Sequence, residues 1–178
     1  MKMWNGKLGT KNGKELKFEN KVENCTANSQ FSTLHSQFPP DTILLIDANP
    51  LIMDLNRRTL TKRGYRVLEA DTISQGRMLF AEEQPDLIMM EVELPDGSGL
   101  HFCEELRDYS DIPIIFVTMP GTVDDEIAGY DAGGNAYVPK PYKPDMLVVR
   151  MEGLLRSKER ARSRALEQIW EENRQSDN

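Results

Sequence analysis

Short apolar runs alternate along residues 41–156 with longer stretches in which apolar residues recur every three or four positions. The short runs have the length of buried strands: TILLID (42–47), YRVLEA (65–70), DLIMME (86–91), PIIFVT (113–118) and AYVP (136–139). The longer stretches have the spacing of amphipathic helices and cover 50–63, 72–83, 98–109, 122–132 and a segment that begins at Pro144. This alternation predicts an α/β domain with a parallel, doubly wound sheet.

The pattern divides the chain into three parts. Residues 1–40 are rich in Lys, Asn, Gly and Ser and have no sustained period, which predicts a disordered or loosely docked tail that ends at Pro39-Pro40. Residues 41–156 form the predicted domain. Residues 157–178 contain neither Gly nor Pro and continue the last helix as an extension.

The helical extension allows two interpretations. A seam of heptad spacing runs through Met151, Leu155, Lys158, Arg162, Ala165 and Ile169, with two charges in its middle. Such a seam is a weak coiled-coil signal that would give a homodimer through this helix. The alternative is a helix that simply extends into solvent, and the sequence leaves both open.

Charge and composition exclude several classes of function. Residues 41–156 carry 11 basic and 21 acidic side chains, a net charge of −10, so we do not expect this domain to bind nucleic acid. The chain has neither a long apolar span nor the apolar start of a secretion signal, which predicts a cytoplasmic protein without membrane contact. Its two cysteines, Cys25 and Cys103, provide no disulfide framework or zinc site.

Polar side chains stand where the predicted strands end. The first strand ends in Asp47, the third in Glu91 and the fourth in Thr118, and the fifth leads into Lys140. Ligands of an open parallel sheet bind beyond the carboxyl ends of its strands, so these four side chains are expected to meet at one edge. Two carboxylates, a hydroxyl and an ammonium can hold a divalent cation and a phosphoryl group, although structural ion pairs also gather at such ends.

Strings in residues 41–156 resemble the receiver domain of two-component response regulators, in order and in spacing: ILLID-NP, GY, PDLI, LPDGSGL, LR, IPIIFVT, AGGNAYVPKP and LLR. The resemblance implies a flavodoxin-like fold with five parallel strands in the order 2-1-3-4-5 and five helices. It places Asp47, Glu91, Thr118 and Lys140 in the phosphoacceptor pocket. It also implies that Thr118 and Tyr137 are the switch residues, and that the bond before Pro141 is cis.

The chain departs from the family pattern at three positions. The family has two adjacent acids after its first strand, where this chain has Asp47-Ala48, so the direct magnesium ligand is missing. Glu91 stands in place of the phosphate-accepting Asp, and Met119 in place of a small residue. The resemblance therefore implies a degenerate pocket that binds Mg²⁺ weakly or not at all, with Asp47, Glu91 and Glu93 as the remaining candidate ligands.

The departures predict a pseudo-receiver that works through protein contacts. Glu91 is placed to reach Thr118 and Lys140, where an ion pair would imitate part of the phosphorylated state. The resemblance implies as partner a sensor kinase, another regulator or a downstream effector, bound through the face of the fourth helix, fifth strand and fifth helix. We expect no enzymatic activity beyond residual self-phosphorylation and dephosphorylation, and no DNA-binding output from the residues after 156.

Two other hypotheses stay open from the sequence. Thr118 and Lys140 are retained, so a functional receiver that accepts a phosphoryl group from a histidine kinase at the third-strand carboxylate with Mg²⁺ is the first. The second is a flavin-binding protein or a dehalogenase-like phosphatase of similar fold. It is weaker, because the first strand is followed by neither a phosphate-binding loop nor a second Asp two residues on.

Overall fold

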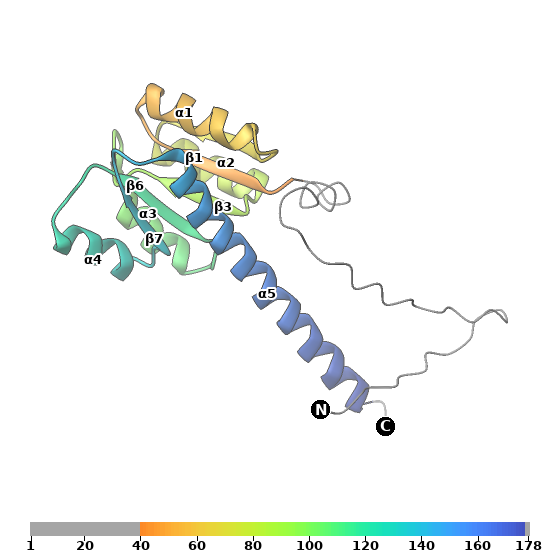
Figure 1. Ribbon diagram of the computed structural model, residues 1–178. Coiled ribbons are helices and arrows are strands. Elements are labelled where there is room, and N and C mark those ends of the chain that lie inside the picture. The colour runs from red at the N-terminus through yellow and green to blue at the C-terminus, as the bar shows by residue number, and fades with distance from the viewer. Residues whose placement is uncertain (1–39, 177–178) are drawn as a thin grey trace, which may run out of the picture. The chain divides into compact units, whose positions relative to one another are not determined.

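A five-stranded parallel sheet forms the centre of the computed structural model, which describes residues 40–176 (Figure 1). Its strands are β1 (Thr42–Ile46), β2 (Arg66–Ala70), β3 (Leu87–Met90), β6 (Ile114–Thr118) and β7 (Ala136–Pro139). They lie in the order β2-β1-β3-β6-β7, and every pair is parallel. The predicted sheet and its 2-1-3-4-5 order are confirmed.

Helices cover both faces of this sheet, as the apolar strands require. They are α1 (Pro50–Thr61), α2 (Ile73–Glu83), α3 (Gly99–Arg107), α4 (Val123–Asp131) and α5 (Pro144–Ser176). Because side chains alternate along each strand, Leu44 and Ile46 of β1 pack with residues of α2 and α3, whereas Ile43 and Leu45 pack with residues of α1 and α5. The sheet therefore has a hydrophobic core on each of its two faces.

Side-chain caps explain where the helices begin. Asn49 caps α1 by accepting from the backbone N–H groups of Leu51 and Ile52, with Pro50 as the first helical residue. Thr122 and Asp125 form a capping box at the start of α4. These caps place the first turns of α1 and α4 immediately beyond β1 and β6, beside the strand ends.

A small antiparallel hairpin follows β3 and was not predicted from the sequence. Its strands are β4 (Glu93–Leu94) and β5 (Gly97–Ser98), which are too short to show a pattern of alternation. The Asp96 carboxylate in the turn accepts hydrogen bonds from the backbone N–H groups of Ile73 and Ser74, at 2.8 Å and 2.9 Å. The hairpin thereby fixes the loop beyond β3 to the first turn of α2.

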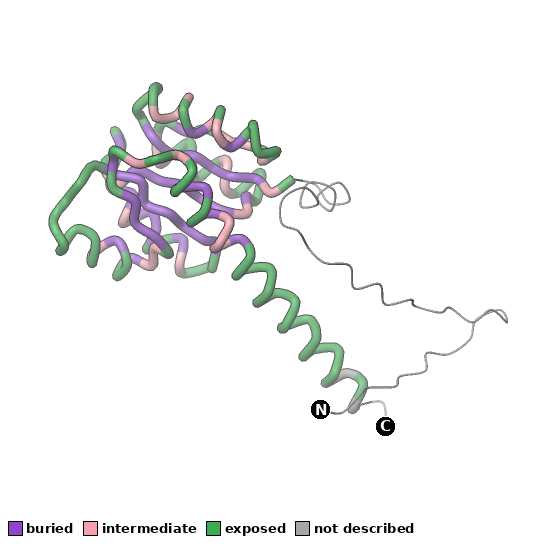
Figure 2. The backbone as a smooth tube through the Cα atoms, viewed as in Figure 1, coloured by how far each residue is buried: buried purple, intermediate pink, exposed green. Residues whose placement is uncertain are grey.

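The last helix is extended, as predicted, and changes character along its length. Its first part is packed on the sheet as far as Leu155, whereas the residues after it are exposed wherever their burial is described (Figure 2). None of the described helices is long and apolar enough to cross a membrane. The predicted tail, residues 1–40, lies outside the described part of the chain except for Pro40.

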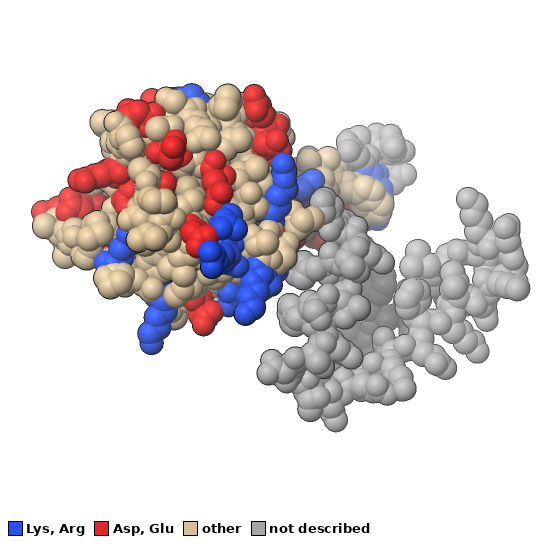
Figure 3. All heavy atoms as spheres, turned by 90° about the horizontal axis from the view of Figure 1, so that it is seen from above, with Lys and Arg blue, Asp and Glu red and all other residues tan. Residues whose placement is uncertain are grey.

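Acidic and basic side chains are interspersed on the surface of the domain. In the view of Figure 3, acidic groups are spread over the upper and left parts of the face, and basic groups gather nearer its lower centre. On the face shown, the basic side chains form no continuous stripe of the kind that binds a phosphate backbone. This distribution agrees with the net negative charge of residues 41–156.

Candidate functional site

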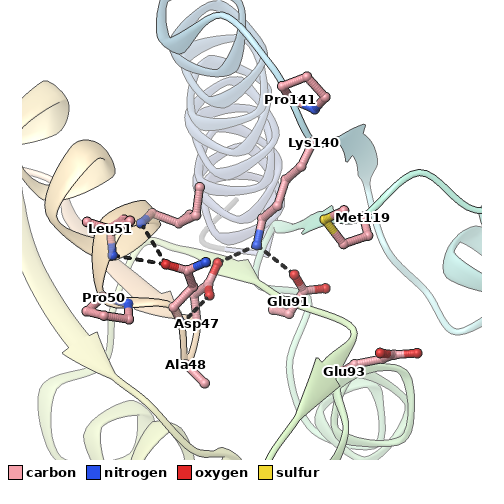
Figure 4. A pocket seen from close by; sticks show the side chains of 11 residues that line it. Asp47, Ala48, Pro50, Leu51, Glu91, Glu93, Met119, Lys140 and Pro141 are labelled. Atoms are coloured by element: carbon pink, nitrogen blue, oxygen red, sulfur yellow. Dashed lines mark hydrogen bonds and ion pairs between the residues drawn. The ribbon is translucent and has the colours of Figure 1, made fainter.

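The four predicted pocket residues lie at the carboxyl edge of the sheet: Asp47, Glu91 and Lys140 line one pocket (Figure 4), and Thr118 lines an adjoining cavity with Glu91. Asp47 follows β1, Glu91 follows β3, Thr118 ends β6 and Lys140 follows β7. Because the strands are parallel and adjacent, their ends converge on one site. All four residues are buried, with exposed fractions between 6% and 8%, which is uncommon for charged side chains.

Lys140 joins the two carboxylates. Its Nζ donates hydrogen bonds to Asp47 Oδ2 at 2.7 Å and to Glu91 Oε2 at 2.6 Å (Figure 4). One ammonium therefore neutralises part of the charge of two acids, and the buried group keeps a net charge of −1. Loss of one partner from an ion pair that is buried to this degree strongly destabilises the folded protein, because the remaining charge is left without compensation.

Backbone amides occupy the other two carboxylate oxygens. Asp47 Oδ1 accepts from the N–H of Asn49 at 2.8 Å, and Glu91 Oε1 accepts from the N–H of Val92 at 2.7 Å. Each carboxylate is thus held between an amide of its own loop and the shared ammonium of Lys140. All four carboxylate oxygens have a donor within the protein.

The same contacts keep Lys140 protonated. Burial by itself lowers the pKa of this ammonium, but the hydrogen bonds and charges of Asp47 and Glu91 outweigh burial, so its pKa lies above the ordinary lysine value. Lys140 is therefore a fixed positive charge across the physiological pH range. It cannot serve as a general base.

Magnesium does not fit the arrangement. Mg²⁺ requires a near-octahedral set of oxygen ligands, and here the Lys140 ammonium already lies between the carboxylates of Asp47 and Glu91 while Ala48 offers no ligand. Glu93 lines the same pocket, but it is exposed and lies apart from the Lys140 group (Figure 4). Within residues 40–176, no group of three or more Asp, Glu, His or Cys side chains is placed to hold a metal.

The predicted switch residues lie beside this group. Thr118 and Tyr137 line a cavity of about 360 Å³ with Glu91 and Asp125. Tyr137 is 6% exposed and points inward, and burial, followed by the charges of Asp125, Glu91 and Glu126, raises its pKa. The expected reach of Glu91 to Lys140 is present, whereas its second oxygen binds the amide of Val92 rather than the Thr118 hydroxyl.

Apolar side chains surround the mouth of the pocket. A hollow of about 770 Å³ opens over Lys140, and its rim includes Pro50, Leu51, Met119 and Pro141. Leu51 is 79% exposed and Met119 is 66% exposed. The bond between Lys140 and Pro141 is cis in this rim. The charged group is thus buried beneath an apolar opening.

Two residues that shape this site were not predicted from the sequence. Asn49 both caps α1 and donates its backbone N–H to Asp47, and an Asn directly before a helix-starting Pro is a recognisable cap signal. Asp125 lines the cavity with Tyr137, and the Thr122-x-x-Asp125 spacing resembles a capping box. Both signals concern helix starts, and their link to the pocket depends on the tertiary fold.

Comparison with known proteins shows the family to which this domain is similar. A model of the response regulator receiver domain matches residues 43–152. The DNA-binding dual master transcriptional regulator RpaA of Synechocystis sp. is 37% identical over 121 residues, covering 66% of this chain and 50% of that protein. The KDP operon transcriptional regulatory protein KdpE of Escherichia coli is 35% identical over 114 residues, covering 64% and 51%. The chain spans about half the length of these curated relatives.

Solved structures show the same fold. A putative response regulator from Chloroflexus aurantiacus is similar with a TM-score of 0.63 and 29% identity, over 65% of this chain and 98% of that one. A CheY-like receiver domain protein from Methanospirillum hungatei is similar with a TM-score of 0.65 and 26% identity, over 68% and 98%.

Proposed function

Because the chain belongs to the receiver domain family of two-component response regulators, we propose that it is an atypical receiver that regulates through protein contacts without phosphorylation of a strand-end carboxylate. In this proposal Glu91 stands where the family has its phosphate-accepting Asp. The observation that carries the proposal is the closed group formed by Lys140, Asp47 and Glu91.

The geometry of Glu91 supports the absence of phosphoryl transfer. An attacking carboxylate oxygen must be free and aligned with the phosphorus, and displacements of about 1 Å cost such reactions heavily. Both oxygens of Glu91 already accept hydrogen bonds, from Val92 and from Lys140. A phosphodonor would also have to pass the exposed Met119 at the rim, and it would find no metal ligand at Ala48.

The ion pair provides a substitute for phosphorylation. Lys140 and Thr118 would hold the oxygens of an acyl phosphate in a standard receiver. Here the Glu91 carboxylate occupies Lys140 at 2.6 Å, and Tyr137 is already buried against the same cavity. We therefore infer that the domain is held permanently in a conformation related to the activated one.

The partner surface is proposed to be the face of α4, β7 and α5. Several large apolar side chains are exposed on these helices: Val123 (74%), Ile127 (50%), Met146 (54%) and Val149 (59%). Exposed apolar groups of this size commonly mark protein interfaces. The proposed partner is a sensor kinase, another regulator or a downstream effector, and dimerisation through α5 is a further proposed contact.

The decisive experiment is incubation with a small-molecule phosphodonor and Mg²⁺, followed by intact mass measurement. Wild type is expected to gain no phosphoryl mass. The Ala48→Asp, Glu91→Asp double variant restores the acid pair and shortens the acceptor, so it is the matched control for the assay. A labelled wild type would overturn the proposal.

A second experiment tests the role of the ion pair in signalling. Glu91→Gln keeps the size of the side chain and removes its charge, so Lys140 loses one of its two ionic partners. We expect this variant to bind a partner of the α4–β7–α5 face more weakly than wild type does, measured as the dissociation constant of the complex. Unchanged binding and dimerisation would refute the role of Glu91 as a substitute for phosphate.

One alternative function has an observation in its favour. Thr118 and Lys140 keep the positions and types of a working receiver, at the ends of β6 and β7. A phospho-accepting receiver served by a histidine kinase would use these residues with Mg²⁺, and the mass experiment separates the two functions. The relatives named above are transcriptional regulators, so a role in transcriptional control is a further proposal for the protein that contains this chain.

A further inference from the structure

Two buried hydroxyl groups face the cavity beside the Lys140 group without a hydrogen bond from the protein. Thr118 and Tyr137 are each 6% exposed, and both line this cavity of about 360 Å³. Neither hydroxyl is hydrogen-bonded to any residue in the range 40–176. Every side-chain polar atom that the described residues enclose completely has a partner, so the two unpaired hydroxyls must be open to the cavity.

The two hydroxyls belong to one wall of the cavity. Tyr137 of β7 pairs with Phe116 of β6, two residues before Thr118, so Thr118 and Tyr137 are diagonal neighbours on the same face of the sheet. Hydroxyl groups that are buried to this degree are almost always hydrogen-bonded, either to the protein or to a molecule that it holds. Since a hydroxyl oxygen accepts hydrogen bonds, this wall can receive a ligand that has N–H groups.

The cavity has an acidic lining. The carboxylates of Glu91, Glu93 and Asp125 line it, whereas no Lys or Arg of the described chain does. Glu91 shares the ammonium of Lys140 with a second acid, so its charge is only partly neutralised. Burial and then the charges of nearby acids, with Asp125 first, raise the pKa of Tyr137. A cleft lined by charges of one sign attracts ligands of the opposite sign, so a cation is favoured here.

The rest of the lining is apolar and does not suit a bare metal ion. It consists of Val92, Leu100, Met119 and Pro120 with the backbone of Gly121. Mg²⁺ and Ca²⁺ need six or more oxygen ligands, and no group of three or more metal-binding side chains is placed for this within the described part of the chain. Small-molecule sites have volumes of about 300 to 1,000 Å³, so the cavity suits a small organic ligand.

We propose that this cavity binds a small organic cation, a primary ammonium or a guanidinium group on a short apolar chain. The N–H groups of the ligand donate to the hydroxyls of Thr118 and Tyr137, and the acidic lining offsets its charge. The apolar chain packs on Leu100 and Met119, and Met119 also lies on the rim of the neighbouring hollow (Figure 4). The inference goes beyond the proposed function, because the binding depends on the cavity and not on the state of phosphorylation.

The test titrates the full chain with butylammonium and follows heat and backbone amide chemical shifts. We expect saturable binding, with the largest shifts at amides that line the cavity, such as those of Val92, Met119 and Gly121. Two probes separate charge from hydrogen bonding. The neutral 1-butanol has the same chain without the charge, and tetramethylammonium has the charge without N–H donors. Both are expected to bind at least about tenfold more weakly than butylammonium.

Variants locate the site. Thr118→Val and Tyr137→Phe each remove one hydroxyl and keep the size of the side chain, so each should weaken butylammonium binding about tenfold. Thr42→Val is the matched control: Thr42 is 8% exposed at the start of β1, at the opposite edge of the sheet, and its variant should bind as wild type does.

A second pair of variants avoids the buried core. Glu93 is exposed at the cavity, so Glu93→Gln should leave the fold intact and weaken binding severalfold through the loss of one negative charge. Glu104→Gln removes an exposed acid of α3 that does not line the cavity, and it should leave binding unchanged.

Three outcomes would overturn the inference. Absence of butylammonium binding up to about 10 mM would show that water is enough for the two hydroxyls. Equal binding of 1-butanol would show that charge plays no part, and equal losses in Thr118→Val and Thr42→Val would place the site elsewhere. A chain that binds butylammonium but gains phosphoryl mass would overturn only the proposed function, and a chain that does neither would overturn only this inference.

Discussion

Lys140 is the residue on which the pocket depends. It provides the single ammonium between Asp47 and Glu91, and each of these side chains is only about a tenth exposed. Either carboxylate without Lys140 would be a buried charge with one backbone amide as its remaining partner. The cost of burying the acids is therefore offset mainly by one side chain that is distant from them in sequence.

Lys140→Met should reveal this dependence. Removing the common partner of a buried ion group leaves two uncompensated acids, and we expect the free energy of unfolding to fall by about 3 kcal/mol at neutral pH. Urea unfolding measures the change. Lys143→Met is the control, because Lys143 is exposed, and it should change stability by less than about 0.5 kcal/mol. Equal losses in both variants would contradict the structural role of Lys140.

The raised pKa of Tyr65 makes the stability of the folded chain depend on pH in the alkaline range. Burial, followed by the charges of Glu152 and Asp41, raises the pKa of Tyr65 to about 12. An unfolded tyrosine titrates near pH 10, so the folded chain holds this proton more tightly, and the resulting stability is lost as pH rises from about 10 towards 12. Burial is also the largest cause that raises the pKa values of Tyr137 and Tyr142.

Thermal unfolding of Tyr65→Phe tests this account. The midpoint of wild type should fall steeply above about pH 10, and the variant should show a shallower fall because one of the contributing protons is gone. Tyr109→Phe is the matched control, since Tyr109 is 62% exposed, and its profile should follow wild type. Identical slopes for wild type and Tyr65→Phe would contradict the prediction.

At the scale of elements, strands and helices of the domain were predictable because each has its own pattern. β1, β3 and β6 are buried on both faces and read as continuous apolar runs, and α1 begins at a Pro preceded by a capping Asn. The β4–β5 hairpin was missed because two-residue strands have no period. The hydrogen bonds of the Arg107 side chain were not predicted either. Arg107 donates to the carbonyl oxygens of Gly133 and Ser110, and Gly133 is distant from it in sequence.

The pocket residues were predictable from the sequence, but not all of their hydrogen-bond partners were. Identity and position at a strand end were enough to bring Asp47, Glu91 and Lys140 together. The second partners of the carboxylates are backbone amides of Asn49 and Val92, which no side-chain pattern marks. The sequence therefore indicated the members of the pocket, whereas the backbone donors to their carboxylates follow only from the tertiary fold.

The hairpin provides a prediction at this scale. Asp96 accepts from the backbone N–H groups of Ile73 and Ser74, and these hydrogen bonds hold the pKa of its carboxyl below the ordinary value. Asp96→Ala should lower the urea midpoint at neutral pH. The difference from wild type should shrink as pH falls through the pKa of the folded state, because a protonated Asp96 no longer contributes this stability.

A matched variant controls for the loss of one surface acid. Asp111→Ala removes an exposed carboxylate elsewhere on the domain, so its midpoint should stay close to that of wild type at every pH. If Asp96→Ala and Asp111→Ala were equally stable at neutral pH, the hairpin would not support the first turn of α2.

At the scale of the whole molecule, we expect the domain to be stable without the part of α5 that extends beyond it. A chain that stops after Lys158 keeps the Lys158–Asp86 ion pair and all the residues whose burial is described as complete, so its free energy of unfolding should match the full chain within about 0.5 kcal/mol when both are dilute. Only the full chain should gain stability with rising concentration, because self-association stabilises the folded state by mass action. Thermal unfolding over a concentration series measures both effects.

The ion pairs that Lys140 forms within the pocket affect how such a domain could carry information. An acyl phosphate has a limited lifetime, because it is added by a donor and lost by hydrolysis. Here each of the four carboxylate oxygens accepts a hydrogen bond from an N–H group of the chain itself, and on the proposed function no phosphoryl group is added or lost. On the proposed function, the strength of the signal would depend on the amount of the protein in the cell. Synthesis and degradation of the chain would then control the signal in place of a kinase and a phosphatase.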